Sequence, residues 1–160
     1  IIMFLFCKIL YKWAQEHVES TRKNVVLVLE EAHRYINEDD SDDYKLGNYY
    51  IERIAREGRK YGISLIVSSQ RPSELSKTVL SQCNSFIIHR ITNKSDLDFI
   101  TKLLTIDDKE YLNIIPGLEK QYAIITGEAF GYSDIARIIT ASPTPKSDDP
   151  TVIDSWKSEE

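Results

Sequence analysis

Two adjacent carboxylates, Glu30 and Glu31, are the residues of this sequence with the clearest capacity for chemistry. They follow directly on an unbroken apolar run, residues 25–29. A run of that length predicts a strand buried on both faces, as in parallel sheets covered by helices. In open sheets of this kind the ligand lies beyond the carboxyl ends of the strands. Carboxylates there need a cation, hydrogen-bond donors or solvent to offset their desolvation, so the pair indicates a ligand site.

This pattern is that of a Walker B element in nucleotide hydrolases, where the first acid helps to hold Mg²⁺ and the second polarises the attacking water. A plainer explanation is a buried strand that runs into a helix whose first turn carries glutamate, because the helix dipole favours negative charge there. Residues 24–33 by themselves leave both explanations open.

A second apolar run, residues 63–67, is followed by Ser68, Ser69 and Gln70, so polar side chains again gather just past the end of a predicted strand. A helix over residues 44–61 is expected between the two strands, with Gly62 placed to end it. Its end carries basic residues that include Arg56 and Arg59. They are either functional or a solvated stripe favoured by the helix dipole.

The remaining expected elements connect these two strands to a second group of strands. We predict a helix over 1–18, a short helix over 73–82 capped by Ser73, a strand over 86–91, a helix to 104 capped by Ser95, a short helix from Asp107, and a hairpin formed by 122–125 and 135–139. The acidic segment 37–43 is expected to be a solvated loop. Residues from 142 onward are expected to form a flexible tail.

Composition sets limits on the class of protein. The 160 residues are 42% hydrophobic and 28% charged, which is typical of a soluble globular domain, and the net charge of -5 does not indicate a strongly basic nucleic-acid binder. Cys7 and Cys83 lack metal-site spacing and suggest a reducing, cytoplasmic compartment. The apolar start, residues 1–7, is too short to span a bilayer, so no membrane partner is expected.

His33 and His89 do not predict a zinc site, and Lys77, Lys94 and Lys102 are expected to face water.

Five segments in order are more specific than any one of them: 29–33 (LEEAH), 56–62 (REGRKYG), 69–73 (SQRPS), 80–84 (LSQCN) and Arg90 at the end of the next strand. Together they resemble the C-terminal half of the ATPase domain in the HerA family, within the HerA–FtsK group of RecA-like ATPases. The resemblance implies an α/β fold, a RecA-like P-loop three-layer sandwich with a mostly parallel sheet. Residues 1–141 would form the ATPase part, and 142–160 would be a tail or an arm that latches onto the adjacent subunit.

Family membership implies a hexameric ring that hydrolyses ATP with Mg²⁺, moves double-stranded DNA, and works with a nuclease or a sirtuin-type effector in DNA repair or anti-phage defence. By position, Glu30 matches the Walker B acid that assists Mg²⁺, although the family usually has aspartate there. Glu31 matches the catalytic glutamate, and Gln70 matches the polar sensor of the γ-phosphate or the attacking water. Arg56 and Arg59 match the trans-acting basic element, with Arg56 the preferred candidate.

No Gly-x-x-x-x-Gly-Lys-Ser/Thr loop occurs in the sequence. In the family this Walker A loop lies upstream, on a strand beside the one predicted over residues 64–68. We therefore expect a fragment whose sheet lacks a central strand and which is inactive in isolation. Two alternatives to the motor remain: an ATP-dependent scaffold that assembles an effector with little DNA movement, and an ATPase-like fold without activity.

Overall fold

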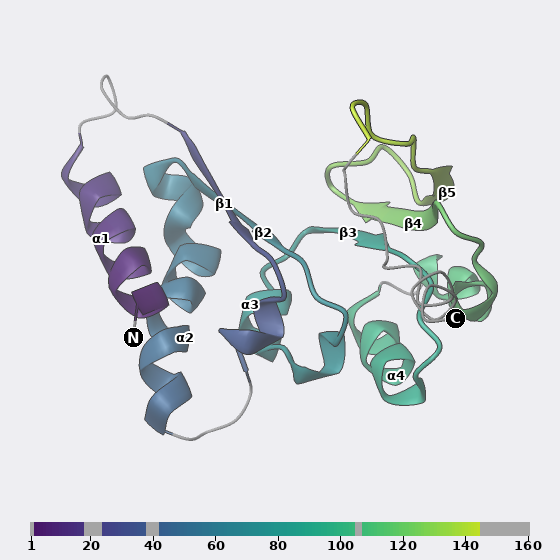
Figure 1. The fold of residues 1–160 in the computed structure, drawn as a ribbon, viewed down its shortest axis with the longest axis horizontal. Helices are drawn as coiled ribbons and strands as arrows, with labels where there is room; N and C mark the ends of the chain where they lie inside the picture. The colour runs from purple at the N-terminus through teal and green to yellow at the C-terminus, as the bar shows by residue number, and fades with distance from the viewer. Residues whose placement is uncertain (1, 18–23, 38–41, 105–106, 145–160) are drawn as a thin grey trace, which may run out of the picture.

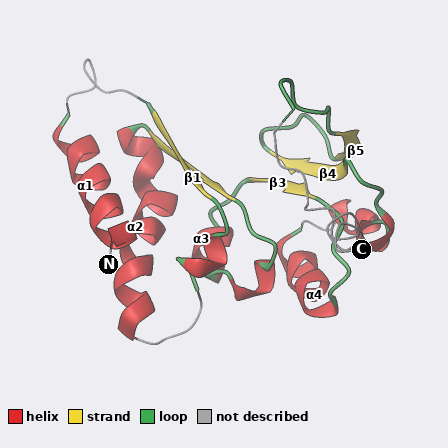
Figure 2. Cartoon of the chain, in the orientation of Figure 1, coloured by secondary structure: helices red, strands yellow, loops and turns green. Residues whose placement is uncertain are grey.

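The computed structural model describes residues 2–17, 24–37, 42–104 and 107–144, with only the backbone described for 42–47 and 107–109. Helices and strands alternate through the first half and give way to a hairpin near the end (Figures 1 and 2). The α-helices and strands are α1 (Ile2–Glu16), β1 (Val25–Leu29), α2 (Asp42–Glu57), β2 (Ile63–Val67), α3 (Lys77–Leu80), β3 (Ser85–Ile88), α4 (Lys94–Leu103), β4 (Tyr122–Gly127) and β5 (Asp134–Arg137). The 3₁₀ turns are η1 (Ala32–Arg34), η2 (Gly58–Tyr61), η3 (Pro72–Glu74), η4 (Asp107–Asn113) and η5 (Ile115–Gly117).

Strands β1 and β2 pair in parallel, in a register that places Val25 opposite Ile63 and Leu29 opposite Val67. Both strands lie where their apolar runs predict them, and α2 forms the crossover between them. The crossover ends through η2 at Gly62, which has a φ of 73° and so adopts the left-handed conformation that glycine tolerates best. The carboxyl ends of the two strands therefore lie side by side, which brings the segments after Leu29 and Val67 together.

Helices α1 and α2 pack against each other and share the core of this first sheet (Figure 1). The core consists of buried side chains from α1, β1, α2, β2 and the segment through α3, among them Cys7, Tyr11, Leu29, Ile51, Ile54, Ile63 and Val79. Tyr11 on α1 is fully buried and donates a hydrogen bond of 2.6 Å to Oε2 of Glu57, at the end of α2. Burial and this bond raise the pKa of Tyr11 well above its usual range, so the phenol stays protonated.

The prediction that the first strand is buried on both faces is wrong for the described chain. Leu27 and Leu29 point into the core, but Val26 and Val28 are 58% and 52% exposed, and Ile66 on β2 is 52% exposed. Helix α1 likewise has a second apolar side, because Ile2, Leu5, Phe6 and Ile9 are exposed opposite the buried side of the helix. The described helices thus cover one face of the parallel pair, and its other face is an exposed apolar surface.

Strands β3, β4 and β5 form a separate antiparallel sheet in which β4 is central. The predicted hairpin is confirmed, with Ala123 opposite Ala136, whereas the strand predicted over 86–91 ends at Ile88. A second core forms under this sheet from α4, η5 and the strands, and it includes Ile88, Ile100, Ile115, Leu118 and Ile124. The α/β class with a parallel sheet and a C-terminal antiparallel hairpin is confirmed.

No described backbone hydrogen bond joins the two sheets as a ladder, so within the described ranges β2 pairs only with β1 and β3 pairs only with β4. Each of these strands therefore has one edge without a strand partner. Figure 1 draws β3 between the β1–β2 pair and β4. This is the arrangement expected of a sheet that lacks a central strand.

Two predicted helix caps are placed differently in the structure. Asn93, and not Ser95, caps α4, because its side-chain oxygen accepts hydrogen bonds from the backbone N–H groups of Ser95 and Asp96. Ser73 does not cap a helix: its hydroxyl donates to Asp96 instead, and the short helix begins at Lys77 after η3. Asn and Ser are nearly equal as caps, so spacing alone did not distinguish them.

Most of the acidic segment 37–43 and of the tail from 142 lies outside the residues whose side chains are described. Among the described helices, none is long and apolar enough to cross a membrane.

Gly127 at the end of β4 provides a test of the second sheet. Its φ of +103° is a conformation that L side chains rarely adopt, and an added Cβ would lie 2.6 Å from Cα of Ser85 and closer still to the carbonyl oxygen of Asn84. Both obstacles are backbone atoms, at the first residue of β3 and the residue before it, so they cannot move aside cheaply. We expect Gly127→Ala to lower the free energy of unfolding by about 2 kcal/mol or more.

Gly131→Ala, in the loop that follows Gly127, is the matched control, because a Cβ there would meet nothing within 4 Å. Its effect should stay within about 1 kcal/mol. Urea unfolding of both variants measures the difference. Equal stability of the two variants would contradict the close approach of β3 to Gly127.

Candidate active site at the carboxyl edge of the parallel strands

Hydrogen bonding continues past the ends of β1 and β2 and fixes the segments that follow. The backbone N–H of Ser68 donates to the carbonyl of Leu29, and the N–H of Ala32 donates to the carbonyl of Ser68, both at 2.9 Å. These two bonds extend the ladder beyond the last paired residues. As a result, Glu31 and Gln70 leave their strands at the same edge of the sheet, where open α/β sheets bind ligands.

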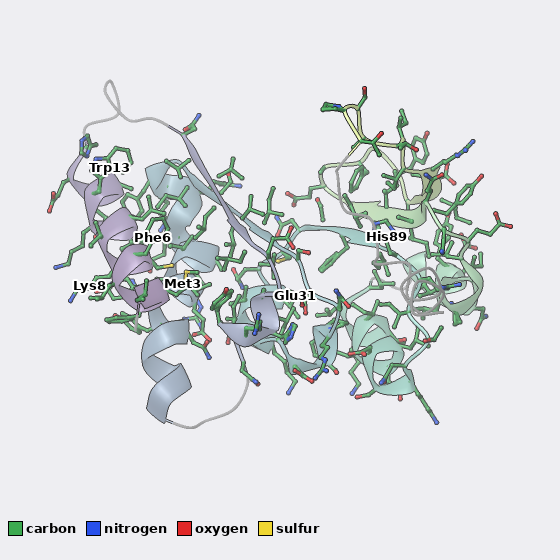
Figure 3. The ribbon with its side chains drawn as sticks, viewed as in Figure 1. Met3, Phe6, Lys8, Trp13, Glu31 and His89 are labelled. Atoms are coloured by element: carbon green, nitrogen blue, oxygen red, sulfur yellow. The ribbon has the colours of Figure 1, made fainter. Side chains whose placement is uncertain are left out.

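Glu31 itself adopts a left-handed backbone conformation, with φ 49° and ψ 46°. For a residue other than glycine this costs about 1–2 kcal/mol. The turn is held on both sides, because Ala32 is tied to Ser68 and the N–H of Arg34 donates to the carbonyl of Glu31 at 2.9 Å. The chain therefore reverses at Glu31 into η1, and Figure 3 shows Glu31 at the lower end of β1, where the strand gives way to this turn.

The side chains of Glu31 and Gln70 meet across the strand ends. Nε2 of Gln70 donates a hydrogen bond of 2.8 Å to Oε1 of Glu31. The carboxylate is 38% exposed, so it is open to solvent and to a ligand while held by the amide. The two residues that sequence reasoning placed at separate strand ends are thus in direct contact.

Glu30 lies one residue earlier, directly after the last residue of β1. Its side chain is exposed and has no hydrogen-bond or ion-pair partner among the described residues. Among those residues there is also no group of three His, Cys, Asp or Glu side chains that could hold a metal ion. One exposed carboxylate fits Mg²⁺, which keeps several waters and is commonly held by one or two carboxylates together with substrate phosphates. Glu30 therefore fits the role of an outer ligand, with the phosphates supplying the rest.

His33 is a member of the site that sequence reasoning missed. Its Nδ1 lies 3.1 Å from Oγ of Ser69 and 3.5 Å from Oε2 of Glu31. The hydroxyl of Ser69 also accepts a hydrogen bond of 3.0 Å from the N–H of Arg71. The spacing of the histidines indicates no metal site, and the signal for this contact is that His33 and Ser69 both follow strands that end at the same side of the sheet.

Arg56 and Arg59 lie elsewhere. Both are exposed, in the last turn of α2 and in η2, just before β2 begins. Gly58 between them is so close to the carbonyl oxygen of Ile63 that an added Cβ would be 2.8 Å away, which fixes this segment at the amino end of β2. The length of β2, on the order of 16 Å for five residues, separates that end from Gln70. These arginines and Glu31 therefore belong to opposite edges of the same sheet.

The segment after Gln70 is supported by α4. Asp96, which is 7% exposed, accepts hydrogen bonds on Oδ1 from the backbone N–H of Ser73 at 3.0 Å and from its hydroxyl at 2.6 Å. The N–H of Ser76 donates to the carbonyl of Ile36 at 3.3 Å, so the chain after His33 is joined to the chain before α3. The loops that carry Gln70 and His33 are thus held from both sides.

Comparison with known proteins shows what this arrangement resembles. The chain is 40% identical over 114 residues to the DNA double-strand break repair helicase HerA of Pyrococcus furiosus, covering 71% of this chain and 20% of that protein. It is 34% identical over 139 residues to HerA of Sulfurisphaera tokodaii, covering 83% and 26%, and 33% identical over 144 residues to a probable HerA of Methanocaldococcus jannaschii, covering 89% and 28%. The chain is HerA-like in sequence, and the predicted resemblance is confirmed.

Solved structures agree on the fold. The crystal structure of B204, the DNA-packaging ATPase of Sulfolobus turreted icosahedral virus, matches with a TM-score of 0.65 at 22% identity, covering 84% of this chain and 62% of that one. The B204 NTPase of Sulfolobus turreted icosahedral virus 2, in complex with AMPPCP, matches with a TM-score of 0.62 at 19% identity, covering 85% and 62%. No family model matches the chain. The HerA-like chain spans 20–28% of the length of these curated relatives.

Asp96 offers a test of how α4 supports the site. In Asp96→Ala the N–H and the hydroxyl of Ser73 lose their shared acceptor in a largely buried place, so we expect a loss of about 2 kcal/mol in the free energy of unfolding. Asp96→Asn keeps an acceptor oxygen and should lose less. Asp98→Ala, at an exposed position of the same helix, is the control in urea unfolding. Equal losses in Asp96→Ala and Asp98→Ala would contradict the supporting role.

Proposed function

We propose that this chain is the C-terminal part of an ATP-hydrolysing motor domain that acts on double-stranded DNA as a ring of identical subunits. The observation that carries the proposal is the hydrogen bond between Gln70 and Glu31 at the carboxyl edge of two parallel strands, beside the exposed Glu30. Its relatives are named as repair helicases and viral DNA-packaging ATPases, which supports DNA as the substrate class. The ATP-analogue complex of one structural neighbour supports ATP as the ligand.

In this proposal the chain's own residues divide the work of phosphoryl transfer to water. Glu31 orients the attacking water and accepts its proton, since a carboxylate at 38% exposure can reach a ligand at the strand ends. Gln70 carries an amide that can reach either Glu31 or a γ-phosphate oxygen. Glu30 helps to hold Mg²⁺ through water, and the ion when bound supplies charge neutralisation at the phosphates.

The phosphate-binding loop is proposed to come from a strand outside this sequence that inserts beside β2. Within the described ranges β2 and β3 each have one edge without a strand partner, which supports this, because the backbone N–H and C=O groups of an open edge can pair with a further strand. The exposed apolar side chains Val26, Val28 and Ile66 support it as well, since the same insertion would bring a layer to cover them. The chain on its own is then expected to be inactive, and residues 142–160 to serve as an arm toward the next subunit.

Ring assembly follows in this proposal from the position of the basic element. Arg56 and Arg59 lie about one strand length from Glu31, too far to reach phosphates bound at their own subunit's Glu31. A neighbouring subunit could present them there, as an arginine finger offsets charge that develops at the phosphate. The ring is proposed to be hexameric and to act with a nuclease or sirtuin-type effector. These are expectations from the resemblance to the HerA family.

Glu31→Gln in the full-length protein tests the proposed chemistry. The amide cannot accept the proton of the water, and we expect ATP turnover to fall by about a hundredfold or more while ATP binding is retained. Hydrolysis is measured with and without double-stranded DNA, beside Glu119→Gln as an exposed control outside the site. DNA-stimulated turnover that vanishes only in Glu31→Gln supports the motor. Normal turnover in Glu31→Gln would refute it, and turnover that DNA does not stimulate favours the scaffold alternative.

Mixing two inactive variants tests the action of arginine between subunits. Arg56→Ala keeps Glu31, and Glu31→Gln keeps Arg56, so a co-expressed mixture restores both groups only where the two kinds of subunit meet. Random mixing makes roughly one quarter of the interfaces competent. We expect the mixture to regain measurable ATP turnover, with Arg59→Ala tested in parallel. A mixture as inactive as its components would show that Arg56 does not act across the interface.

A further inference from the structure

His33 lies between the two strand ends that carry the site. Its imidazole is largely shielded, at 16% exposure, and its Nδ1 faces two oxygens: Oγ of Ser69 at 3.1 Å and Oε2 of Glu31 at 3.5 Å. Nε2 of Gln70 donates a hydrogen bond of 2.8 Å to the other carboxylate oxygen, Oε1. The two oxygens of Glu31 thus face different groups, one from the turn after β1 and one from the end of β2.

The chemistry of these groups fixes the direction of the contacts. An ionised carboxylate only accepts hydrogen bonds, so the imidazole tautomer that suits Glu31 carries its proton on Nδ1. The hydroxyl of Ser69 already accepts from the N–H of Arg71, which holds its oxygen in place beside the ring. Nδ1–H therefore points between a fixed hydroxyl oxygen and the carboxylate.

The imidazole is not needed to make the turn. Backbone bonds close η1 without it: the N–H of Ala32 donates to Ser68, and the N–H groups of Tyr35 and Ile36 both donate to the carbonyl of Ala32 at 2.9 Å. The His33 side chain is thus available for a task other than local folding. Its two contacts both lead toward the site.

We propose that His33 and Ser69 form a positioning pair for Glu31. The pair keeps the Glu31 carboxylate oriented while the side-chain amide of Gln70 exchanges its hydrogen bond to that carboxylate for one to the γ-phosphate. This inference rests on the proposed function. The amide of Gln70 holds Oε1 at 2.8 Å, so Oε1 loses this donor when Gln70 turns toward the phosphate and becomes free to accept the proton of the water. Oε2 remains held by His33, which the hydroxyl of Ser69 holds in turn. Without the pair, no described side chain would hold the carboxylate once Gln70 leaves, and the carboxylate would rotate away.

Three substitutions at His33 test the proposal in the full-length protein. His33→Ala should lower kcat by about tenfold or more with the KM for ATP changed by less than about twofold, because a misoriented carboxylate affects the reaction step and not the binding of ATP. His33→Asn places an amide donor near the position of Nδ1 and should restore much of the rate. His33→Gln places its amide nearer the position of Nε2 and should not.

Ser69 supplies a second measurement. If the two residues act as a unit, the double variant His33→Ala/Ser69→Ala should be no slower than His33→Ala alone, whereas Ser69→Thr keeps the hydroxyl and should remain close to the wild type. Thermal unfolding midpoints are recorded for every variant, since a purely structural role would lower them together and would not distinguish asparagine from glutamine at position 33.

The outcomes separate this inference from the function on which it rests. If Glu31→Gln abolishes turnover but His33→Ala retains the full rate, or if asparagine rescues no better than glutamine, the positioning pair is refuted and the proposed ATPase stands. Losses that multiply in the double variant also refute the pair. Normal turnover in Glu31→Gln refutes both. Selective rescue by asparagine together with non-additive losses supports the pair.

Discussion

The parallel pairing of β1 with β2 is the constraint on which the rest of the site depends. Because the strands are parallel and in register from Val25 to Leu29, their carboxyl ends coincide, and the two backbone bonds at Ser68 extend the pairing into the turns. The contacts of Gln70 with Glu31 and of His33 with Ser69 both cross this junction. A shift of register by one residue would move Gln70 away from Glu31 and turn the core-facing Leu27 and Leu29 outward.

The strained backbone of Glu31 is understandable in this setting. A left-handed glutamate is costly by itself and persists only where the surroundings determine it. Here the conformation is fixed by backbone bonds on both sides, while its carboxylate is held by Gln70 and faces His33. The strained turn thus leaves the carboxylate of Glu31 at the strand ends with few alternative orientations. Such pre-organisation is what the positioning of a reacting group requires.

The two halves of the chain contribute differently. The first sheet, with α1 and α2 on one face, supplies the groups that could do chemistry, and the second sheet with α4 supplies support through Asp96 and Ser73. The edges of β2 and β3 without strand partners, and the exposed valines of β1, mark where the described chain offers surface for further structure. Arg56 and Arg59 lie at the amino end of β2, away from these groups.

The sequence by itself determined the elements that have a strong local signal. Apolar runs placed β1 and β2 to the residue, Gly62 marked the end of the crossover, and the order of the short motifs gave the resemblance to the HerA family. Where local signals compete, the sequence was less decisive: Asn93 and Ser95 are similar caps, and Val26 and Val28 look buried in a run that includes Leu27. Burial depends on what covers a face, and a strand's own residues do not specify this.

Only the tertiary structure decided which polar groups touch. Nothing in the spacing of residues 31, 33, 69 and 70 specifies that Gln70 meets one oxygen of Glu31 while His33 faces the other, since those contacts arise from strand register and from a left-handed turn. The same holds for Asp96. Its place in the sequence indicates only an acidic residue in the first turn of a helix, whereas the structure shows that it accepts a hydrogen bond from Ser73. Local chemistry fixed the elements of this protein, and the geometry between strands fixed its site.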